Sequence, residues 1–321
     1  MSPLRIGILG AARIAPIAVV RPARELAGVE VHAVAARDPE RAREHAAHYG
    51  ITHVAPTYRA LIERDDLDAI YIALPAAAHF EWSVAALRAG KHVLCEKPVA
   101  TSVAQAEELV AVANAEGRLM VEAYHYVYHP YFARIRELVS QDLGDIESIE
   151  ALHSNWVPRD WPVYWSAELG GGAMFHLGGY LVHCVRSLTQ APLTVDAVSA
   201  TWLDGVDTTV DATLTLAQIH TSMCREDGFE NWLRVQGTRG TLHAVNFIVP
   251  HYGPAKGASE ARLRLDVVGR PPMVEPAESR STYLYQLEAF VAAVRDGTAL
   301  PTTGRDIIDT MRVIEAIRTH G

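Results

Sequence analysis

Three side chains that can carry protons follow a triple glycine in the middle of the chain. They are His176, Tyr180 and His183, after Gly170–Gly172. On an α-helix the spacings i, i+4 and i+7 place all three on one face. Two imidazoles and a phenol on one face could exchange protons with a bound substrate.

Two other interpretations of this group remain open. His183 could be a hydrogen-bonded histidine of the core, since single buried histidines are common. A metal site on His176 and His183 is less favoured, because no third ligand stands at a familiar spacing. We therefore expect no metal at these residues.

A tryptophan-rich segment precedes the triple glycine, with Trp156, Trp161 and Trp165 close together. Aromatic faces suit the apolar faces of sugar rings, so Trp156 and Trp165 are candidate substrate contacts. Arg159 could bind a carboxylate or phosphate of the substrate. Packing in the core or at a subunit interface explains the aromatic residues equally well.

The first 123 residues alternate between short apolar runs and helical patterns. Strands are expected at Leu4–Leu9, Val29–Ala36, Ala69–Leu74, His92–Cys95 and Met120–Ala123. Helices are expected at Ile14–Leu26, Pro39–Tyr49, Phe80–Ala89 and Ser102–Glu116. This alternation indicates βαβ units, and hence a doubly wound parallel sheet with helices on both faces.

The loop after the first expected strand is a variant of the dinucleotide-binding fingerprint. The residues from Gly10 to Ala15 read G-x-A-x-x-A. Gly10 permits the tight turn, and the start of the next helix offers N–H groups to a pyrophosphate. A plain strand–turn–helix is the alternative, because Ala12 replaces a glycine. The βα units favour cofactor contacts from Gly10, Ala12, Arg13 and Ile14.

The second expected strand ends at residues that could select the cofactor. Arg37 takes the strand-end position and Asp38 follows it. An acidic residue there binds the ribose of NAD, whereas a nearby Arg accommodates the 2′-phosphate of NADP. This order favours NADP(H) and leaves NAD(H) possible. In the alternative, Arg37 and Asp38 only form a surface pair at the next helix.

Two further strand ends should meet at the same crevice, because ligands of doubly wound sheets lie beyond the carboxyl ends of the strands. One is Leu74–His79 and the other is Glu96–Pro98. Lys97 would lie where the nicotinamide meets the substrate. The expected cofactor contacts are Leu74, Pro75, His79, Glu96 and Lys97.

The pattern changes near residue 124, where longer strands begin. Strands are expected at Ile146–His153, Val195–Trp202, Val210–Ile219, Trp232–Val235, Thr241–Val249 and Arg262–Val267, with helices at Tyr131–Ser140 and Gly304–His320. Residues 250–280 resemble a surface loop. We expect a Rossmann domain over 1–123 and an α+β substrate-binding and oligomerisation domain over 124–321, with an open, largely antiparallel sheet. The last helix could pack back on the first domain.

At these residues the chain resembles the Gfo/Idh/MocA family, named after glucose-fructose oxidoreductase and inositol dehydrogenase. The segment Ala89–Pro98 is close to the most specific signature of that family. Further matches occur at Glu122–Tyr124, His129–Pro130, Gly170–Gly172, Gln236–Gly240 and Tyr285–Phe290.

The resemblance implies NAD(P)-dependent oxidation or reduction of sugars and polyols, with Lys97 as a catalytic residue. An ammonium can hydrogen-bond the reacting oxygen, and burial beside a cationic nicotinamide would lower its pKa. The alternative, a solvated surface lysine, is disfavoured by its place after a buried strand.

The chain departs from many family members after the triple glycine. They carry Asp where this chain has His176, His where it has Tyr180, and Asp or Asn where it has His183. A tyrosine at the middle position resembles the dihydrodiol dehydrogenase and glucose-fructose oxidoreductase branches, where it is the proposed acid/base. Tyr180 or His176 is thus the expected proton carrier.

The expected reaction is hydride transfer between a nicotinamide and a secondary hydroxyl or carbonyl of a sugar, polyol or cyclic diol. Redox-assisted glycoside cleavage with tightly held NAD is one alternative. A non-enzymatic cofactor-binding regulator is another, although a pure sensor need not keep Lys97 and Tyr180.

Composition and net charge indicate which binding partners and which cellular location to expect. A net charge of −9 over 321 residues disfavours nucleic acid and anionic membranes as partners. The apolar stretch Ile6–Val20 is interrupted by Arg13 and Pro16, so we expect neither a signal peptide nor a membrane helix. Three widely spaced cysteines fit a reducing, cytoplasmic location. An open sheet usually packs on another subunit, which predicts a homodimer or homotetramer.

Overall fold

The computed structural model describes residues 2–189, 192–226 and 228–320. Contacts divide the chain into two compact units. The first contains the residues up to Tyr124 and the segment Tyr283–Asp309, which thus returns to it late in the chain. The second contains His125–Thr282 and the end of the chain from Thr310.

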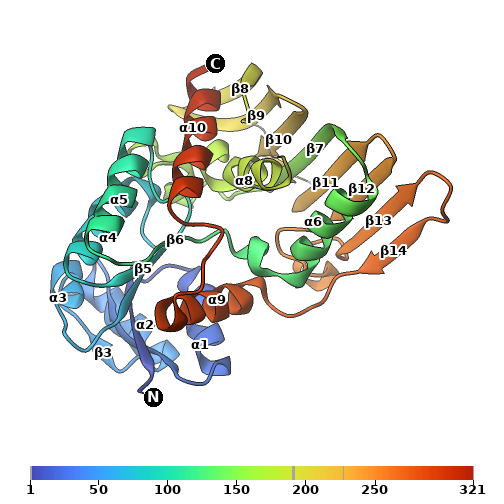
Figure 1. Cartoon of the computed structure of the whole chain (residues 1–321). Helices are drawn as coiled ribbons and strands as arrows, with labels where there is room; N and C mark the ends of the chain where they lie inside the picture. Colours follow the sequence, from blue (N-terminus) through green and yellow to red (C-terminus); the bar gives the residue numbers. More distant parts are fainter. Residues whose placement is uncertain (1, 190–191, 227, 321) are drawn as a thin grey trace. The chain divides into compact units, whose positions relative to one another are not determined.

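The first unit is built on a six-stranded parallel sheet with the order β3-β2-β1-β4-β5-β6 (Figure 1). The order reverses between β1 and β4, which is the doubly wound Rossmann arrangement and confirms the expected fold class. The strands are β1 (Leu4–Leu9), β2 (Val29–Ala35), β3 (His53–Val54), β4 (Ala69–Ile72), β5 (His92–Cys95) and β6 (Met120–Glu122).

Helices pack on both faces of this sheet. Ile6 and Ile8 of β1 share a buried core with Val19 and with Phe290 of the return segment. Gly7 faces the other way, where an added Cβ would lie 2.6 Å from Leu61. The helices are a π-helix (Pro16–Val20), α1 (Arg21–Glu25), α2 (Pro39–Tyr49), α3 (Tyr58–Ile62), α4 (Ala76–Arg88), α5 (Val103–Ala115) and α9 (Thr282–Asp296).

The second unit is built on an eight-stranded sheet with the order β14-β13-β12-β11-β7-β10-β9-β8 (Figure 1). All neighbouring strands are antiparallel except β7 and β10, which confirms a largely antiparallel sheet. The strands are β7 (Ile146–Ser154), β8 (Val195–Leu203), β9 (Val206–Leu214), β10 (Ala217–Ser222), β11 (Glu230–Gly237), β12 (Gly240–Val245), β13 (Arg262–Val267) and β14 (Met273–Pro276).

One face of the second sheet is covered and the other is open. In β9, Val210, Ala212 and Leu214 are buried, whereas Asp211 and Thr213 between them are exposed. Helices α6 and α8 lie over the covered face (Figure 1). The longer helices of this part of the chain are α6 (Pro130–Asp142), α8 (Gly179–Leu188) and α10 (Arg305–His320). The shorter ones are α7 (Pro162–Trp165), 3-10 turns at His125–Tyr128, Ala167–Leu169 and Pro254–Lys256, and a π-helix at Met174–Gly178.

The expected strand over Val210–Ile219 is wrong, because the chain reverses inside it. β9 ends at Leu214 and β10 begins at Ala217. Leu216 adopts a left-handed φ of 61° between them. No Gly, Pro or Asn marks this turn, so the apolar alternation hides it.

Other elements differ in extent. α4 begins at Ala76 rather than Phe80, because Pro75 takes the extended N-cap position and alanines favour the helix. β14 lies within residues 250–280, which the sequence suggests are loop, and pairs with β13. The short elements β3 and α3 and the long α9 were not expected.

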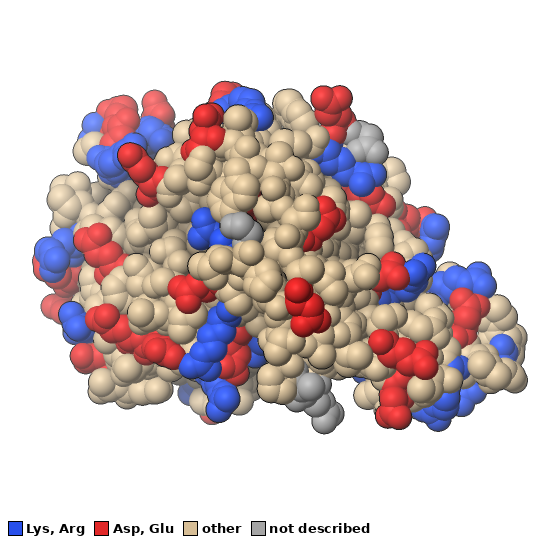
Figure 2. All heavy atoms as spheres, turned by 90° about the horizontal axis from the view of Figure 1, so that it is seen from above, with Lys and Arg blue, Asp and Glu red and all other residues tan. Residues whose placement is uncertain are grey.

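Charged side chains of both signs are mixed on the face that Figure 2 shows. Figure 2 shows Lys and Arg scattered among Asp and Glu over the face in view. Among the described residues, no helix combines the length and apolarity that crossing a bilayer requires.

Candidate functional site

The loop after β1 is packed between the ends of two neighbouring strands. Gly10 has a φ of 103°, and its N–H donates to the Ala35 carbonyl of β2 at 2.8 Å. A Cβ at Gly10 would lie 2.6 Å from the Ala73 carbonyl oxygen, just after β4. Only glycine fits this close approach. Beyond it, Ala12 and Ile14 are half-buried and Arg13 is exposed.

Two arginines flank this loop on the β2 side. Arg37 is exposed, whereas Asp38 accepts a hydrogen bond from Glu40 N at 2.9 Å as the N-cap of α2. Arg41 donates to the Ala11 carbonyl at 3.2 Å, within the Gly10 loop. Sequence reasoning missed Arg41, although it stands one helical turn after Arg37. The Asp38 carboxylate thus caps α2, and Arg37 and Arg41 place positive charge beside the loop.

Tyr58 of α3 lies close to the same arginines. Burial raises the pKa of its phenol, and the positive charges of Arg37 and Arg41 act against that rise. A basic surface therefore stands beside the end of β2.

His79 ties together the loops that follow β4 and β5. Its Nε2 lies 2.7 Å from the Leu74 carbonyl oxygen and its Nδ1 lies 2.7 Å from that of Pro98. The side chain is only 2% exposed. His79 therefore positions the segment around Lys97, and its expected contact with a cofactor stays a prediction. Leu74 and Pro75 are half-buried at the start of the same connection.

Lys97 is half-buried beside two carboxylates. Burial lowers the pKa of its amine to about 8, while the negative charges of Glu96 and Glu122 oppose that fall. Glu96 accepts a hydrogen bond from the Tyr71 hydroxyl at 2.7 Å. Glu122 accepts one from Val99 N at 3.1 Å. An amine with this pKa can donate or accept a proton near neutral pH.

In the second unit, Tyr180 lies between two histidines that sequence reasoning did not select. Its hydroxyl is 3.0 Å from His125 Nε2. The His153 ring meets the Tyr180 ring edge-on, with centroids 5.5 Å apart. His153 Nδ1 lies 3.2 Å from the Leu177 carbonyl oxygen. Tyr180 therefore has the hydrogen-bonded phenol that proton transfer requires.

The residues 176, 180 and 183 do not share one regular α-helix. A π-helix spans Met174–Gly178, and α8 begins at Gly179. His183 is 1% exposed and its Nδ1 lies 2.7 Å from the Tyr126 hydroxyl, which favours the core-histidine interpretation. π-helical turns are frequent at functional sites, and this one separates His176 from the other two.

His176 contacts the tryptophan-rich segment instead. Its Nε2 lies 3.1 Å from the Val163 carbonyl oxygen, and its ring lies 4.2 Å from that of Tyr164. In the same segment, the Arg159 guanidinium stacks on the Trp165 ring at 3.6 Å. Trp165 also donates its indole N–H to Pro158 at 3.0 Å.

Trp156 differs from Trp165 because most of it is open to solvent. It is 53% exposed and forms an isolated bridge with Cys224. Its place as a substrate contact stays a prediction.

A buried carboxylate requires glycine at the last position of the triple glycine. Gly172 has a φ of 119°, and a Cβ there would lie 2.3 Å from Asp207 Oδ1. Asp207 also accepts a hydrogen bond from Met174 N at 2.6 Å, and Arg318 lies 3.7 Å away. Burial raises the pKa of Asp207, and the Met174 N–H and Arg318 counter it. These contacts fix the start of the π-helix that carries His176.

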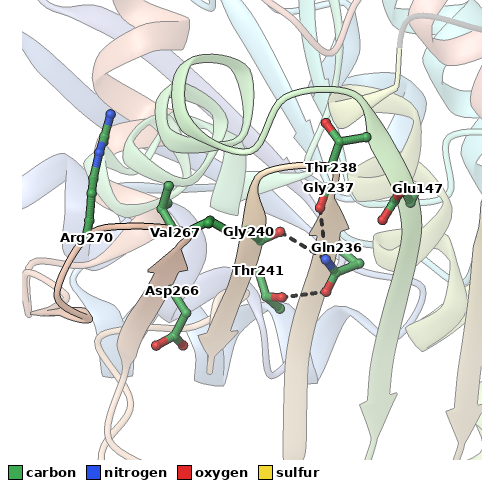
Figure 3. Close-up of a pocket in the computed structure, with 10 residues that line it drawn as sticks. Glu147, Gln236, Gly237, Thr238, Gly240, Thr241, Asp266, Val267 and Arg270 are labelled. Atoms are coloured by element: carbon green, nitrogen blue, oxygen red, sulfur yellow. Dashed lines mark hydrogen bonds between the residues drawn. The ribbon is translucent and has the colours of Figure 1, made fainter.

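A surface pocket of about 460 Å³ lies at the turn between β11 and β12. Figure 3 shows Gln236 closing this turn: its amide donates to the Gly237 carbonyl at 2.9 Å and accepts from Thr241 Oγ1 at 2.5 Å. Gly240 is required because a Cβ would lie 2.3 Å from the Asp266 carbonyl oxygen. The motif Gln236–Gly240 is thus explained by the geometry of a hairpin.

Comparison with known families matches both parts of the chain. Residues 4–124 match the model of an oxidoreductase family with an NAD-binding Rossmann fold. Residues 132–243 match the C-terminal domain of the same family. The chain belongs to the Gfo/Idh/MocA family. It is accordingly an NAD(P)-dependent oxidoreductase, as the sequence predicted.

Relatives with assigned activities align over nearly the whole chain. A D-xylose 1-dehydrogenase (NADP(+)) of Haloferax volcanii is 32% identical, covering 98% of this chain and 96% of the relative. A dTDP-3,4-didehydro-2,6-dideoxy-alpha-D-glucose 3-reductase of Actinomadura kijaniata is 32% identical, covering 99% and 96%. The crystal structure of a 3-ketoreductase from Actinomadura kijaniata, with NADP and TDP-benzene, superposes with a TM-score of 0.89 at 28% identity, covering 99% and 98%.

Proposed function

We propose that this protein transfers a hydride between NADP(H) and a secondary hydroxyl or carbonyl of a sugar, polyol or cyclic diol. The observation that carries the proposal is the place of Lys97, half-buried directly after β5 in a segment that His79 ties to the loop after β4. Burial lowers the pKa of its amine to about 8. Relatives named as a xylose dehydrogenase and as a dTDP-sugar 3-reductase support the substrate class.

The loop at Gly10 fits the phosphates of a dinucleotide. Its backbone approaches β2 and β4 so closely that any side chain at Gly10 would clash, which leaves main-chain groups at the carboxyl edge of the sheet. Ala12, Arg13 and Ile14 continue this loop, and Leu74 and Pro75 border it. A bound nicotinamide dinucleotide supplies or accepts the hydride.

The chain's own residues then handle the substrate oxygen. In the first unit, the Lys97 ammonium is the candidate hydrogen-bond donor to the reacting oxygen. In the second unit, Tyr180 is the candidate proton carrier. His125, hydrogen-bonded to the Tyr180 hydroxyl, stabilises the phenol as its proton moves. His176 orients a neighbouring hydroxyl. Arg159, stacked on Trp165, offers an aromatic and cationic surface to the substrate.

The reaction is tested with a panel of xylose, glucose, inositols, dihydrodiols and dTDP-3-keto sugars. Net oxidation of NADPH or reduction of NADP with a panel member would support the proposal. Product formed without net cofactor change would instead indicate redox-assisted glycoside cleavage. Cofactor binding with no turnover on the whole panel would contradict an enzymatic role.

Arg37→Ala is expected to weaken NADPH binding by about 10- to 100-fold, since a charge-assisted hydrogen bond to the 2′-phosphate is lost. NADH binding should change by less than about threefold, because NADH has no phosphate there. Fluorescence titration of both cofactors measures this. Arg43→Ala is the control, because Arg43 is exposed on α2, the helix that follows Arg37, and pairs with Glu40. Equal losses for both cofactors would contradict the assignment.

We also propose that the open face of the second sheet is covered by another copy of the chain. Leu152 and Trp232 lie opposite each other there, both only half-buried. Glu150 and Arg234 form an ion pair beside them. The molar mass in solution tests this proposal, and a monomer at assay concentrations would contradict it.

A further inference from the structure

The first unit contains a cluster of metal-ligating side chains away from the residues discussed above. His32, His53 and Asp66 each place one ligand atom so that all three atoms lie within 4.8 Å of one another. His53 is the first residue of β3, and Asp66 precedes β4. Gly10 and Lys97, by contrast, follow the carboxyl ends of their strands. The cluster therefore lies toward the amino ends of the parallel strands, whereas the proposed cofactor loops follow their carboxyl ends.

A β-bulge places His32 in this cluster. The residues before and after it, Val31 and Ala33, lie opposite consecutive residues of β1, so His32 is an extra residue in β2. Bulges redirect a side chain relative to the regular alternation of a strand. The His32 ring lies 4.5 Å from the His53 ring as a result.

His32 is held between two carboxylates. Its Nδ1 lies 2.5 Å from Glu30 Oε1, and its Nε2 lies 3.1 Å from Asp66 Oδ2. A neutral imidazole has only one N–H. If Nδ1–H donates to Glu30, the Nε2 lone pair faces the Asp66 carboxylate, and a metal ion held between these two atoms would bind both. A carboxylate that holds the other ring nitrogen is the usual partner of a metal-bound histidine.

We propose that His32, His53 and Asp66 bind a divalent transition-metal ion, with Zn²⁺ the best fit. Zinc accepts imidazole and carboxylate ligands at about 2.0–2.2 Å, so two ligands on a tetrahedral ion lie about 3.4 Å apart. The separation of 3.1 Å between His32 and Asp66 is close to that value. The ion would join β3, which has only two residues, to β2 and to the loop before β4.

Arg64 binds the same carboxylate of Asp66 that faces His32. Its guanidinium donates to both carboxylate oxygens, at 2.8 and 2.6 Å. These bonds orient the carboxylate, and the positive charge opposes a metal ion on the same group. The affinity for zinc should therefore be moderate, in the micromolar range.

Metal-free full-length protein is titrated with zinc sulfate by calorimetry, and its melting is followed with and without zinc. The wild type should bind one equivalent, and its Tm should rise by about 4 °C at saturating zinc. His53→Asn and Asp66→Asn should each weaken binding at least tenfold. His48→Asn should bind as the wild type does, because His48 is exposed on α2 outside the cluster.

Arg64→Gln should change the affinity for zinc in the opposite direction. Removing its charge should tighten zinc binding severalfold, which a merely structural role for the cluster does not predict. Absence of binding at millimolar zinc would overturn the proposal, and would leave the contact of His32 with Asp66 as an ordinary hydrogen bond. Equal binding by the wild type and His53→Asn would also overturn it.

Discussion

Lys97→Met is expected to lower turnover by about 10³-fold while making the protein more stable. Methionine has a similar length but cannot donate a hydrogen bond to the substrate oxygen. Ionising an amine whose pKa has fallen from 10.5 to about 8 costs about 3 kcal/mol, and the variant avoids that cost. That pKa already includes the attraction of the ammonium to Glu96 and Glu122. We therefore expect the free energy of unfolding to rise by about 1–3 kcal/mol.

The sign of this stability difference depends on pH. The unfolded chain holds the Lys97 proton up to its ordinary pKa, whereas the folded chain releases it near pH 8. Wild-type stability should therefore rise with pH between about 8 and 10.5. The advantage of Lys97→Met should be full below pH 8 and should disappear toward pH 10.5. Denaturant melts of both proteins across this range measure the difference.

The same pKa should appear in the kinetics of carbonyl reduction. kcat/KM for reduction should fall tenfold per pH unit above about pH 8, as the Lys97 ammonium loses its proton. Lys97→Arg carries a permanent charge, so it should keep a small activity whose kcat/KM does not fall above pH 8. Normal turnover by Lys97→Met would refute the catalytic role, and a loss of stability would refute the account of its burial.

Tyr180→Phe is expected to lower kcat by about 10²- to 10⁴-fold with little change in KM, because a proton carrier is removed and binding is kept. Phenylalanine retains the ring that packs against His153, so the fold should persist. Steady-state kinetics in both directions, together with circular dichroism, measure the two effects.

Tyr126→Phe is the matched control for this variant. Tyr126 is also buried, and its hydroxyl is also hydrogen-bonded to a histidine, at 2.7 Å from His183 Nδ1. Its removal should cost stability of about 1 kcal/mol and leave kcat within a few-fold. A similar loss of kcat in both variants would show that Tyr180 acts through packing, and would contradict its role as proton carrier.

Local patterns predicted elements well where apolar runs end at strong signals. β1, α2 and β13 occupy the expected residues, because Gly, Pro or a change of period marks their ends. The sequence predicts one strand where the structure has β9 and β10, because no residue type marks the left-handed turn at Leu216. β3 has only two residues and is formed by its pairing with β2. A strand this short has no alternating pattern from which it could be predicted.

The sequence by itself determined which side chains stand at the ends of the parallel strands. Gly10, Arg37 and Lys97 each follow a strand, and the doubly wound order brings such positions to one edge. Those assignments needed only local periodicity and the rule for parallel sheets.

Only the tertiary structure decided the partners of these side chains. Arg41 reaches the loop of Gly10 across 30 residues, Tyr180 meets His125 across 55, and His32 meets Asp66 across 34. Such pairs depend on strand order, on a bulge or on a π-helical turn. None of these features produces a hydrophobic periodicity that can be recognised in the sequence. A side chain's type is local, but its pKa and its partner are set by what the fold packs against it.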